Sequence, residues 1–129
     1  MIDPGDPTVV VQRLVEDPAI LGLGDLDLQR SGCRFRQASL LFEARAESVL
    51  YVVELQLGPA DDRQVIRVVE GWAAVRKRRG RRCIAVLVAE RIEPRYASIL
   101  AAIATAVPIV VLEMHFGDGT ARFAPVVLR

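Results

Sequence analysis

Val49-Leu50-Tyr51-Val52-Val53-Glu54-Leu55-Gln56 is the stretch that decides the fold, because it is the strongest strand pattern in the chain and also carries two polar side chains. Side chains alternate across a strand, so Glu54 and Gln56 stand on the same face, next to apolar neighbours. A carboxylate in that position is costly to bury without a partner or a metal ion. The alternative is that the strand surfaces at this end and leaves Glu54 in water.

The residues after this stretch change to a helical period. Apolar side chains recur at helical spacing over Asp62–Arg79, where Asp61 or Asp62 can cap the start and Gly80 ends the helix. Cys83–Ala89 is then a continuous apolar run, which is typical of a strand buried on both faces. Further along we expect a helix over Pro94–Ala106, a buried strand over Ile109–Met114, a turn at Gly117–Gly119 and a last strand over Phe123–Leu128.

The residues before the stretch predict one helix and a meander of strands. In chain order we expect a loose tail over residues 1–7, a helix over Thr8–Glu16, a short strand around Leu26 and Leu28, a turn at Ser31-Gly32, a strand over Phe35–Arg45 and a turn at Ala46–Ser48.

This order of elements predicts an α/β fold, a mixed β-sheet flanked by helices. Strands that are separated by a helix are joined by a crossover and lie parallel, whereas strands that are joined by a tight turn lie antiparallel. We therefore expect Val49–Gln56 to pair antiparallel with Phe35–Arg45 and parallel with Cys83–Ala89.

Length and composition are those of one globular domain spanning residues 1–129. Hydrophobic residues make up 52% of the chain and charged residues 26%, which supplies a core without a disulfide or metal staple. The formal net charge of +1 argues neither for nor against a nucleic-acid partner. Cys33 and Cys83 lack CxxC spacing and are expected to be reduced, structural thiols.

The sequence also bears on location. No apolar run approaches the ~18 residues that suggest a membrane span. Residues 1–7 lack the basic region followed by an apolar region that marks a secretory signal. We therefore expect a cytoplasmic protein without a membrane partner.

The E-x-Q spacing and the order of elements together resemble the PD-(D/E)XK nuclease superfamily. The segments that carry the resemblance lie within Arg34–Met114 and are Tyr51–Gly58, Asp61, Ile66–Trp72 and Ala85–Glu90. They are similar to an uncharacterised bacterial family with an E-x-Q motif, and more loosely to the nuclease domain of mismatch-cutting endonucleases. The resemblance implies a restriction-endonuclease-like αβββαβ core. It also implies that an acid on the second strand and E-x-K or E-x-Q on the third hold a divalent metal, which activates water to cut phosphodiester bonds.

Ser39 occupies the position at which this resemblance implies an aspartate. Counting across a tight turn at Ala46–Ser48 pairs Ser39 with Glu54 and Gln37 with Gln56, within a residue or two. The second carboxylate is therefore missing. One Glu with a hydroxyl and an amide would hold Mg²⁺ or Mn²⁺ only weakly.

Other acids are candidate replacements. Glu43 faces the same way as Ser39 but lies four residues along, about 13 Å at ~3.3 Å per residue, which is too far. Asp61 follows the end of the strand but also suits helix capping, and Glu16 is the acid of the first helix but also suits the surface. The catalytic candidates are Glu54, Gln56, Ser39 and Arg67, and the metal-ligand candidates are Glu54, Asp61 and Glu16.

A basic run, Arg76-Lys77-Arg78-Arg79-Gly80-Arg81-Arg82, ends the long helix. Cations there complement the helix dipole, although such runs also bind phosphates. The run is expected at the end of the sheet opposite to Glu54, which leaves Arg67 as the better cation for the cleft.

Two functions stay open on the sequence. One is a Mg²⁺- or Mn²⁺-dependent nucleic-acid phosphodiesterase with a degenerate or weakened site. The other is a non-catalytic binding or assembly domain of the same fold. Their partners would be nucleic acid in the first case, and nucleic acid or a second copy of the chain in the other.

Overall fold

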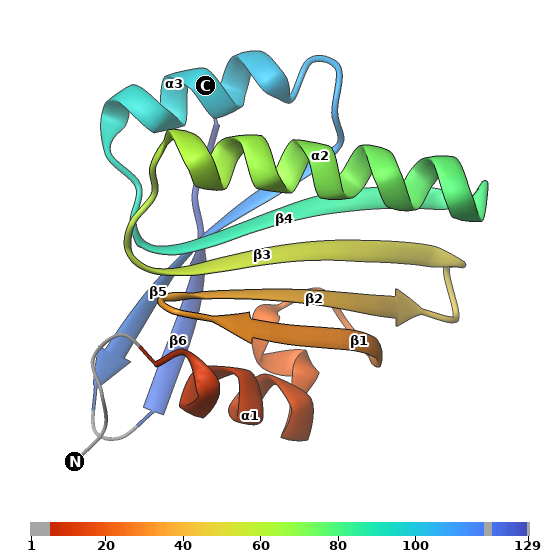
Figure 1. Ribbon diagram of the computed structural model, residues 1–129, viewed down its shortest axis with the longest axis horizontal. Coiled ribbons are helices and arrows are strands. Elements are labelled where there is room, and N and C mark those ends of the chain that lie inside the picture. Colours follow the sequence, from red (N-terminus) through yellow and green to blue (C-terminus); the bar gives the residue numbers. More distant parts are fainter. Residues whose placement is uncertain (1–5, 118–119, 129) are drawn as a thin grey trace.

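The computed structural model describes residues 6–117 and 120–128. In this part of the chain, six strands form a single sheet in the order β1-β2-β3-β4-β5-β6, with helices on both of its faces (Figure 1). The elements are α1 (Thr8–Glu16), η1 (Pro18–Leu21), β1 (Asp27–Arg34), β2 (Gln37–Ala44), β3 (Val49–Pro59), α2 (Asp62–Arg79), β4 (Arg82–Arg91), α3 (Pro94–Ile103), β5 (Ile109–Gly117) and β6 (Thr120–Pro125).

The sheet is mixed, as the sequence predicts. β1, β2 and β3 form an antiparallel meander, β3 pairs parallel with β4, and β4 pairs parallel with β5. β6 is the last strand of the sheet and pairs antiparallel with β5. The predicted fold class, an α/β mixed sheet flanked by helices with an αβββαβ order of elements, is confirmed, and α2 connects the parallel strands β3 and β4.

The register between β2 and β3 is also the predicted one. Ser39 lies opposite Glu54, and Gln37 lies opposite Gln56. The turn between the strands includes Ser48, which takes a left-handed φ of 56°. Because this short turn leaves no room for slippage, the register across the whole hairpin follows from its length.

Two hydrophobic layers cover the two faces of the sheet. On one face, Leu14 of α1 packs with Phe42 and Val53 from the strands. On the other face, Val68 of α2 packs with Leu87 of β4 in a cluster that also contains residues of α3. Glu54 belongs to the α2 face, because Val52, two residues before it on β3, is part of the cluster on that face.

The predicted turn at Ser31-Gly32 is wrong. β1 continues through both residues to Arg34, and the chain reverses at Phe35-Arg36, where Arg36 has a φ of 64°. The Arg36 carbonyl accepts from the Leu57 backbone N–H (2.8 Å), and its guanidinium donates to the Leu57 carbonyl (3.2 Å). These contacts with the end of β3 hold the turn at Arg36, although the local sequence favours Ser-Gly.

Several boundaries differ from the predicted ones by a few residues. Helix α3 ends at Ile103 rather than Ala106, and β6 spans Thr120–Pro125 rather than Phe123–Leu128. Asp118 and Gly119 of the predicted turn, and residues 1–5 of the predicted tail, lie outside the described residues. Pro7, the last residue of that tail, is buried, and its carbonyl accepts from the Val11 backbone N–H.

Two further expectations can be compared with the structure. Both cysteines are free, as expected, and Cys83 is buried whereas Cys33 is exposed. Among the described residues, no helix combines the length and the hydropathy needed to cross a membrane.

Gln64 ties α2 to the centre of the sheet. Its side chain is fully buried, and its amide nitrogen donates to the backbone carbonyls of Glu54 (3.2 Å) and Val88 (2.8 Å). About two turns further along, Gly71 faces β3, where an added Cβ would stand 3.4 Å from the Val52 side chain, an ordinary contact distance. The helix is therefore positioned against the strand that carries Glu54.

The Gln64 tie predicts a measurable loss of stability. Gln64→Ala removes one donor from two buried carbonyls and leaves a cavity, so the free energy of unfolding should fall by about 1–3 kcal/mol in urea titrations. Gln12→Ala, on the exposed face of α1, is the matched control and should change it by less than about 0.5 kcal/mol. Equal effects of the two substitutions would contradict the tie.

Candidate functional site

Glu54 is a buried carboxylate on the α2 face of the sheet. Only 7% of the residue is exposed. The Ser39 hydroxyl donates to its Oε1 at 2.7 Å. Its Oε2 is buried and has no hydrogen-bond partner among the described residues, but it lies 3.8 Å from Nε of Arg67. The carboxylate is therefore held by one hydroxyl and one guanidinium.

Arg67 connects Glu54 to Gln56. Its Nη2 donates to Oε1 of Gln56 at 2.8 Å, and the amide nitrogen of Gln56 donates in turn to the Pro59 carbonyl at 2.8 Å. The four residues predicted as catalytic candidates are thus brought together. Their contacts form one chain that runs from Ser39 through Glu54 and Arg67 to Gln56.

Burial is the main influence on the ionisation of Glu54. Removal from water raises the pKa of this carboxyl above its ordinary value, against the opposing effects of the Ser39 hydrogen bond and the charges of Arg67 and Arg34. Desolvation disfavours the charged form, whereas a donated hydrogen bond and a nearby cation favour it. Glu54 is consequently a stronger base than an exposed glutamate.

The other acids that the sequence singled out do not join this cluster. Asp61 caps α2, since its Oδ1 accepts from the Gln64 backbone N–H at 2.9 Å, and Asp62 accepts from the Tyr96 hydroxyl at 2.9 Å. Glu16 is exposed at the end of α1, which packs against the opposite face of the sheet from Glu54. The structure therefore does not bring Asp61 or Glu16 to Glu54 as metal ligands.

These residues do not fit a divalent cation as they are arranged. In the described part of the chain, no group of three or more acidic, His or Cys side chains could hold a metal ion. Oε1 of Gln56 already accepts from Arg67, and the Ser39 hydroxyl donates to Glu54. Oε2 of Glu54 remains, but it faces a guanidinium, and Mg²⁺ needs several oxygen ligands.

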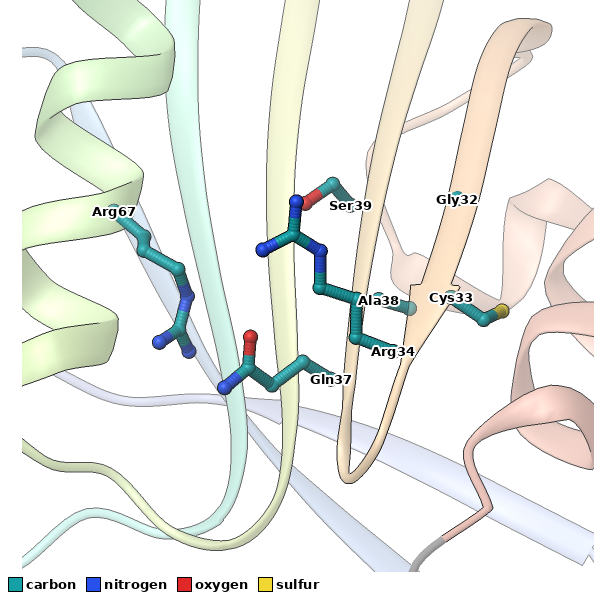
Figure 2. Close-up of a pocket in the computed structure, with 7 residues that line it drawn as sticks. All are labelled: Gly32, Cys33, Arg34, Gln37, Ala38, Ser39 and Arg67. Atoms are coloured by element: carbon teal, nitrogen blue, oxygen red, sulfur yellow. The ribbon is translucent and has the colours of Figure 1, made fainter.

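A hollow of about 310 Å³ opens beside this cluster. It is lined by Gly32, Cys33, Arg34, Gln37, Ala38, Ser39 and Arg67. Figure 2 shows that Arg67 reaches from α2, and Arg34 and Gln37 from β1 and β2, into the space between the helix and the strands, whereas the sulfur of Cys33 points away. Two guanidiniums and an amide thus converge on one hollow.

A second hollow of about 220 Å³ adjoins the first, because Ser39 lines both. Its lining includes Arg30 of β1, Gly71 and Arg78 of α2, and Glu54. We call the two hollows together the arginine groove. Its four arginines are Arg30, Arg34, Arg67 and Arg78, and Glu54 is the one carboxylate among its described lining residues.

Each wall of the arginine groove has a simple periodicity. On β1, Arg30, Gly32 and Arg34 alternate and share the α2 face with Ser39, since Gly32 lies opposite Ser39 and Arg34 opposite Gln37. On α2, the lining residues Arg67, Gly71, Ala74 and Arg78 follow helical spacing. Small residues therefore separate the cations on both walls.

Three of these arginines were missed by sequence reasoning. The signal was the period-two pattern Arg30-Ser31-Gly32-Cys33-Arg34, which the predicted turn at Ser31-Gly32 concealed. The prediction for the basic run is correct for Arg82, which pairs with Val49 at the far end of β3. It is wrong for Arg78, whose side chain lines the same hollow as Glu54, because one helical face runs the length of the groove.

A solved structure of EndoMS in its apo form is similar to this chain. The two share 16% sequence identity at a TM-score of 0.66, over 82% of this chain and 45% of the EndoMS chain. The chain therefore shares its fold with EndoMS. The match spans less than half of the EndoMS chain, and at this identity the likeness shows a shared fold alone. No protein-family model and no curated protein matches the sequence.

The raised pKa of Glu54 predicts a distinct pH dependence of stability. The folded protein binds this proton more tightly than the unfolded chain, so the contribution of Glu54 to stability is greatest at low pH. The free energy of unfolding, relative to Glu54→Gln, should fall as pH rises from about 4.5 through the raised pKa. Urea titrations from pH 4 to 8 would measure it.

Glu70→Gln is the control for this experiment, because Glu70 is exposed on α2. The difference in free energy of unfolding between Glu70→Gln and the parent should be nearly independent of pH over the same window. If the free energy of unfolding of the parent, relative to that of Glu54→Gln, instead increases with pH, the folded-state pKa is lowered. That result would contradict the argument from burial.

The contact between Arg67 and Glu54 predicts how a metal site could be restored. In Ser39→Asp the new carboxylate should pair with Arg67, so affinity for Mn²⁺ should rise little. Combining Ser39→Asp with Arg67→Met should raise it about tenfold or more above either single variant, because two carboxylates then face the groove without a cation between them. Calorimetry with Mn²⁺ measures each affinity.

Ser31→Asp combined with Arg67→Met is the matched control. Ser31 lies opposite Leu40, whose side chain packs on the α1 face, so the added acid points away from Glu54. Equal Mn²⁺ affinities in the two double variants would show that Ser39 is not at the acid position.

Proposed function

We propose that this chain is a single nuclease-like domain that binds the nucleic-acid backbone in the arginine groove and has little or no metal-dependent cleavage. The observation that carries the proposal is the charge of the groove. Four guanidiniums line it, and the one carboxylate beside them is already paired with Arg67. The shared fold of EndoMS supports a nucleic-acid partner, and a cytoplasmic location belongs to the same proposal.

Phosphate is the ligand that suits this groove. Guanidiniums bind phosphate oxygens through two parallel hydrogen bonds, and their neutralisation of the backbone releases condensed counterions. The arginines lie along two walls rather than at one point, as an extended polyanion requires. The net charge of +1 concealed this feature, because the acids of the chain lie mostly outside the groove.

The weak cleavage follows from the residues around Glu54. Metal-dependent hydrolysis needs an ion in place before it can activate water. Ser39 supplies no carboxylate, and Arg67 places a positive charge 3.8 Å from the carboxylate oxygen that a metal would need. We therefore favour binding over catalysis by Mg²⁺ or Mn²⁺. An assembly role, which the sequence left open, uses no feature of the groove.

Neutralising two groove arginines should weaken binding in a salt-dependent way. Arg34→Gln with Arg78→Gln removes one cation from each wall and spares the Arg67 pair with Glu54. The slope of log affinity against log salt should become less negative by about 2, at roughly 0.9 per lost phosphate contact. Fluorescence anisotropy with labelled single-stranded and duplex oligonucleotides measures the slope.

The matched control is Arg13→Gln with Arg45→Gln, which removes the same charge from exposed positions outside the groove. Its slope should stay within about 0.5 of that of the parent. If the two double variants behave alike, or if the parent binds neither oligonucleotide, the groove is not a nucleic-acid site.

A further inference from the structure

We propose that Ser39 and Glu54 form a metal-independent nucleophile and general base that act on phosphodiesters held in the arginine groove. The chemistry belongs to Ser39, the residue at the position where the sequence resemblance implies an aspartate. Its substrate class rests on the proposed function, because the arginines that bind the backbone would also bind the reacting phosphate. The chemical step itself is independent of that binding role and can fail separately.

The first element is the geometry of the pair. The Ser39 Oγ–H donates to Oε1 of Glu54 at 2.7 Å, which is the reach that a nucleophile and its base require. Ser39 is exposed and lines both hollows of the groove, whereas Glu54 is buried behind it. A substrate phosphate can therefore approach the hydroxyl from the groove, with the carboxylate behind it.

The second element is the orientation of the base. A third group normally holds the base of such a pair, and here Arg67 lies 3.8 Å from Oε2 of Glu54 while its Nη2 is bonded to Gln56. The backbone of Glu54 is tied to α2 through Gln64. Burial raises the pKa of the carboxyl, which brings it closer to the operating pH and improves it as a base.

The third element is the stabilisation of developing charge. Arg34 and Arg67 line the same hollow as Ser39, and the charge of each lowers the pKa of Glu54. A phosphoryl group under attack spreads negative charge over its non-bridging oxygens. Two preorganised guanidiniums are suited to that charge and need no metal ion.

The reaction is balanced without a co-reactant other than water. Ser39 Oγ attacks phosphorus as its proton passes to Glu54, an Oγ–P bond forms, and the bond from phosphorus to the leaving oxygen breaks. The leaving oxygen takes the proton from Glu54, or it departs as an anion and Glu54 releases the proton to solvent. Water then attacks the phosphoserine ester as its proton passes to Glu54, the Oγ–P bond breaks, and Glu54 returns the proton to Oγ. The serine is regenerated and a phosphate monoester leaves.

The groove offers no second acid for the leaving group, since arginine does not give up its proton at ordinary pH. Activated phosphodiesters should therefore react faster than nucleic acid, and the phosphoserine should accumulate. This makes bis(4-nitrophenyl) phosphate the appropriate probe, because 4-nitrophenolate leaves without protonation.

The test uses the full chain with EDTA in the buffer. The parent should release 4-nitrophenolate in a burst and carry a phosphoryl adduct that mass spectrometry assigns to Ser39. Ser39→Ala should abolish both signals, and Glu54→Gln should slow the burst by about a hundredfold, the usual contribution of a general base. Ser31→Ala, a serine on the other face of β1, should match the parent.

Folding and binding are measured in parallel, so that each outcome has a single meaning. Circular dichroism should show that Ser39→Ala is folded, oligonucleotide anisotropy is recorded for the parent, and Ser39→Cys should restore an adduct. No adduct in a parent that binds oligonucleotide overturns this inference and leaves the proposed function standing. No adduct and no binding overturns both. An adduct that persists in Ser39→Ala, or one that requires Mn²⁺, also overturns the inference.

Discussion

Burial of the Glu54 carboxylate is the constraint on which the arrangement around it depends. A charge that is 7% exposed costs several kcal/mol unless donors and cations surround it. Ser39 supplies the donor from the neighbouring strand, and Arg67 supplies the cation from α2. Gly71 of the same helix also faces this carboxylate, since a Cβ added there would stand 3.9 Å from Oε1 of Glu54. Sheet register, helix position and charge are thus coupled at one side chain.

The same coupling gives the arginine groove its character. An arginine that pairs with Glu54 must stand on the groove side of α2, and the residues one, two and three turns along that face then line the groove as well. Gly71 and Ala74 keep it open, and Arg78 extends its positive wall. β1 provides the opposing wall with Arg30 and Arg34. A fold shared with EndoMS at 16% identity therefore presents a site dominated by cations rather than by acids.

Local sequence was informative where one physical signal dominated. The alternation in β3 and the length of the turn after β2 were sufficient for the pairing of Ser39 with Glu54, because a short turn permits one register. Helix α2 has the predicted limits, since Asp61 caps its start and Gly80 ends it. Ser31-Gly32 misled because its turn propensity is weak beside the contacts that Arg36 makes with Leu57.

The sequence by itself determined the mixed sheet, the order of its elements and the face on which Glu54 and Gln56 stand, because periodicity and turn length are properties of neighbouring residues. Only the tertiary structure decided which distant side chains share a space. Arg67 lies beside Glu54, and Arg30 and Arg78 line the same hollow, because α2 packs on one face of the sheet while β1 extends past its expected turn. Contacts of this kind depend on packing between elements, which no local pattern encodes.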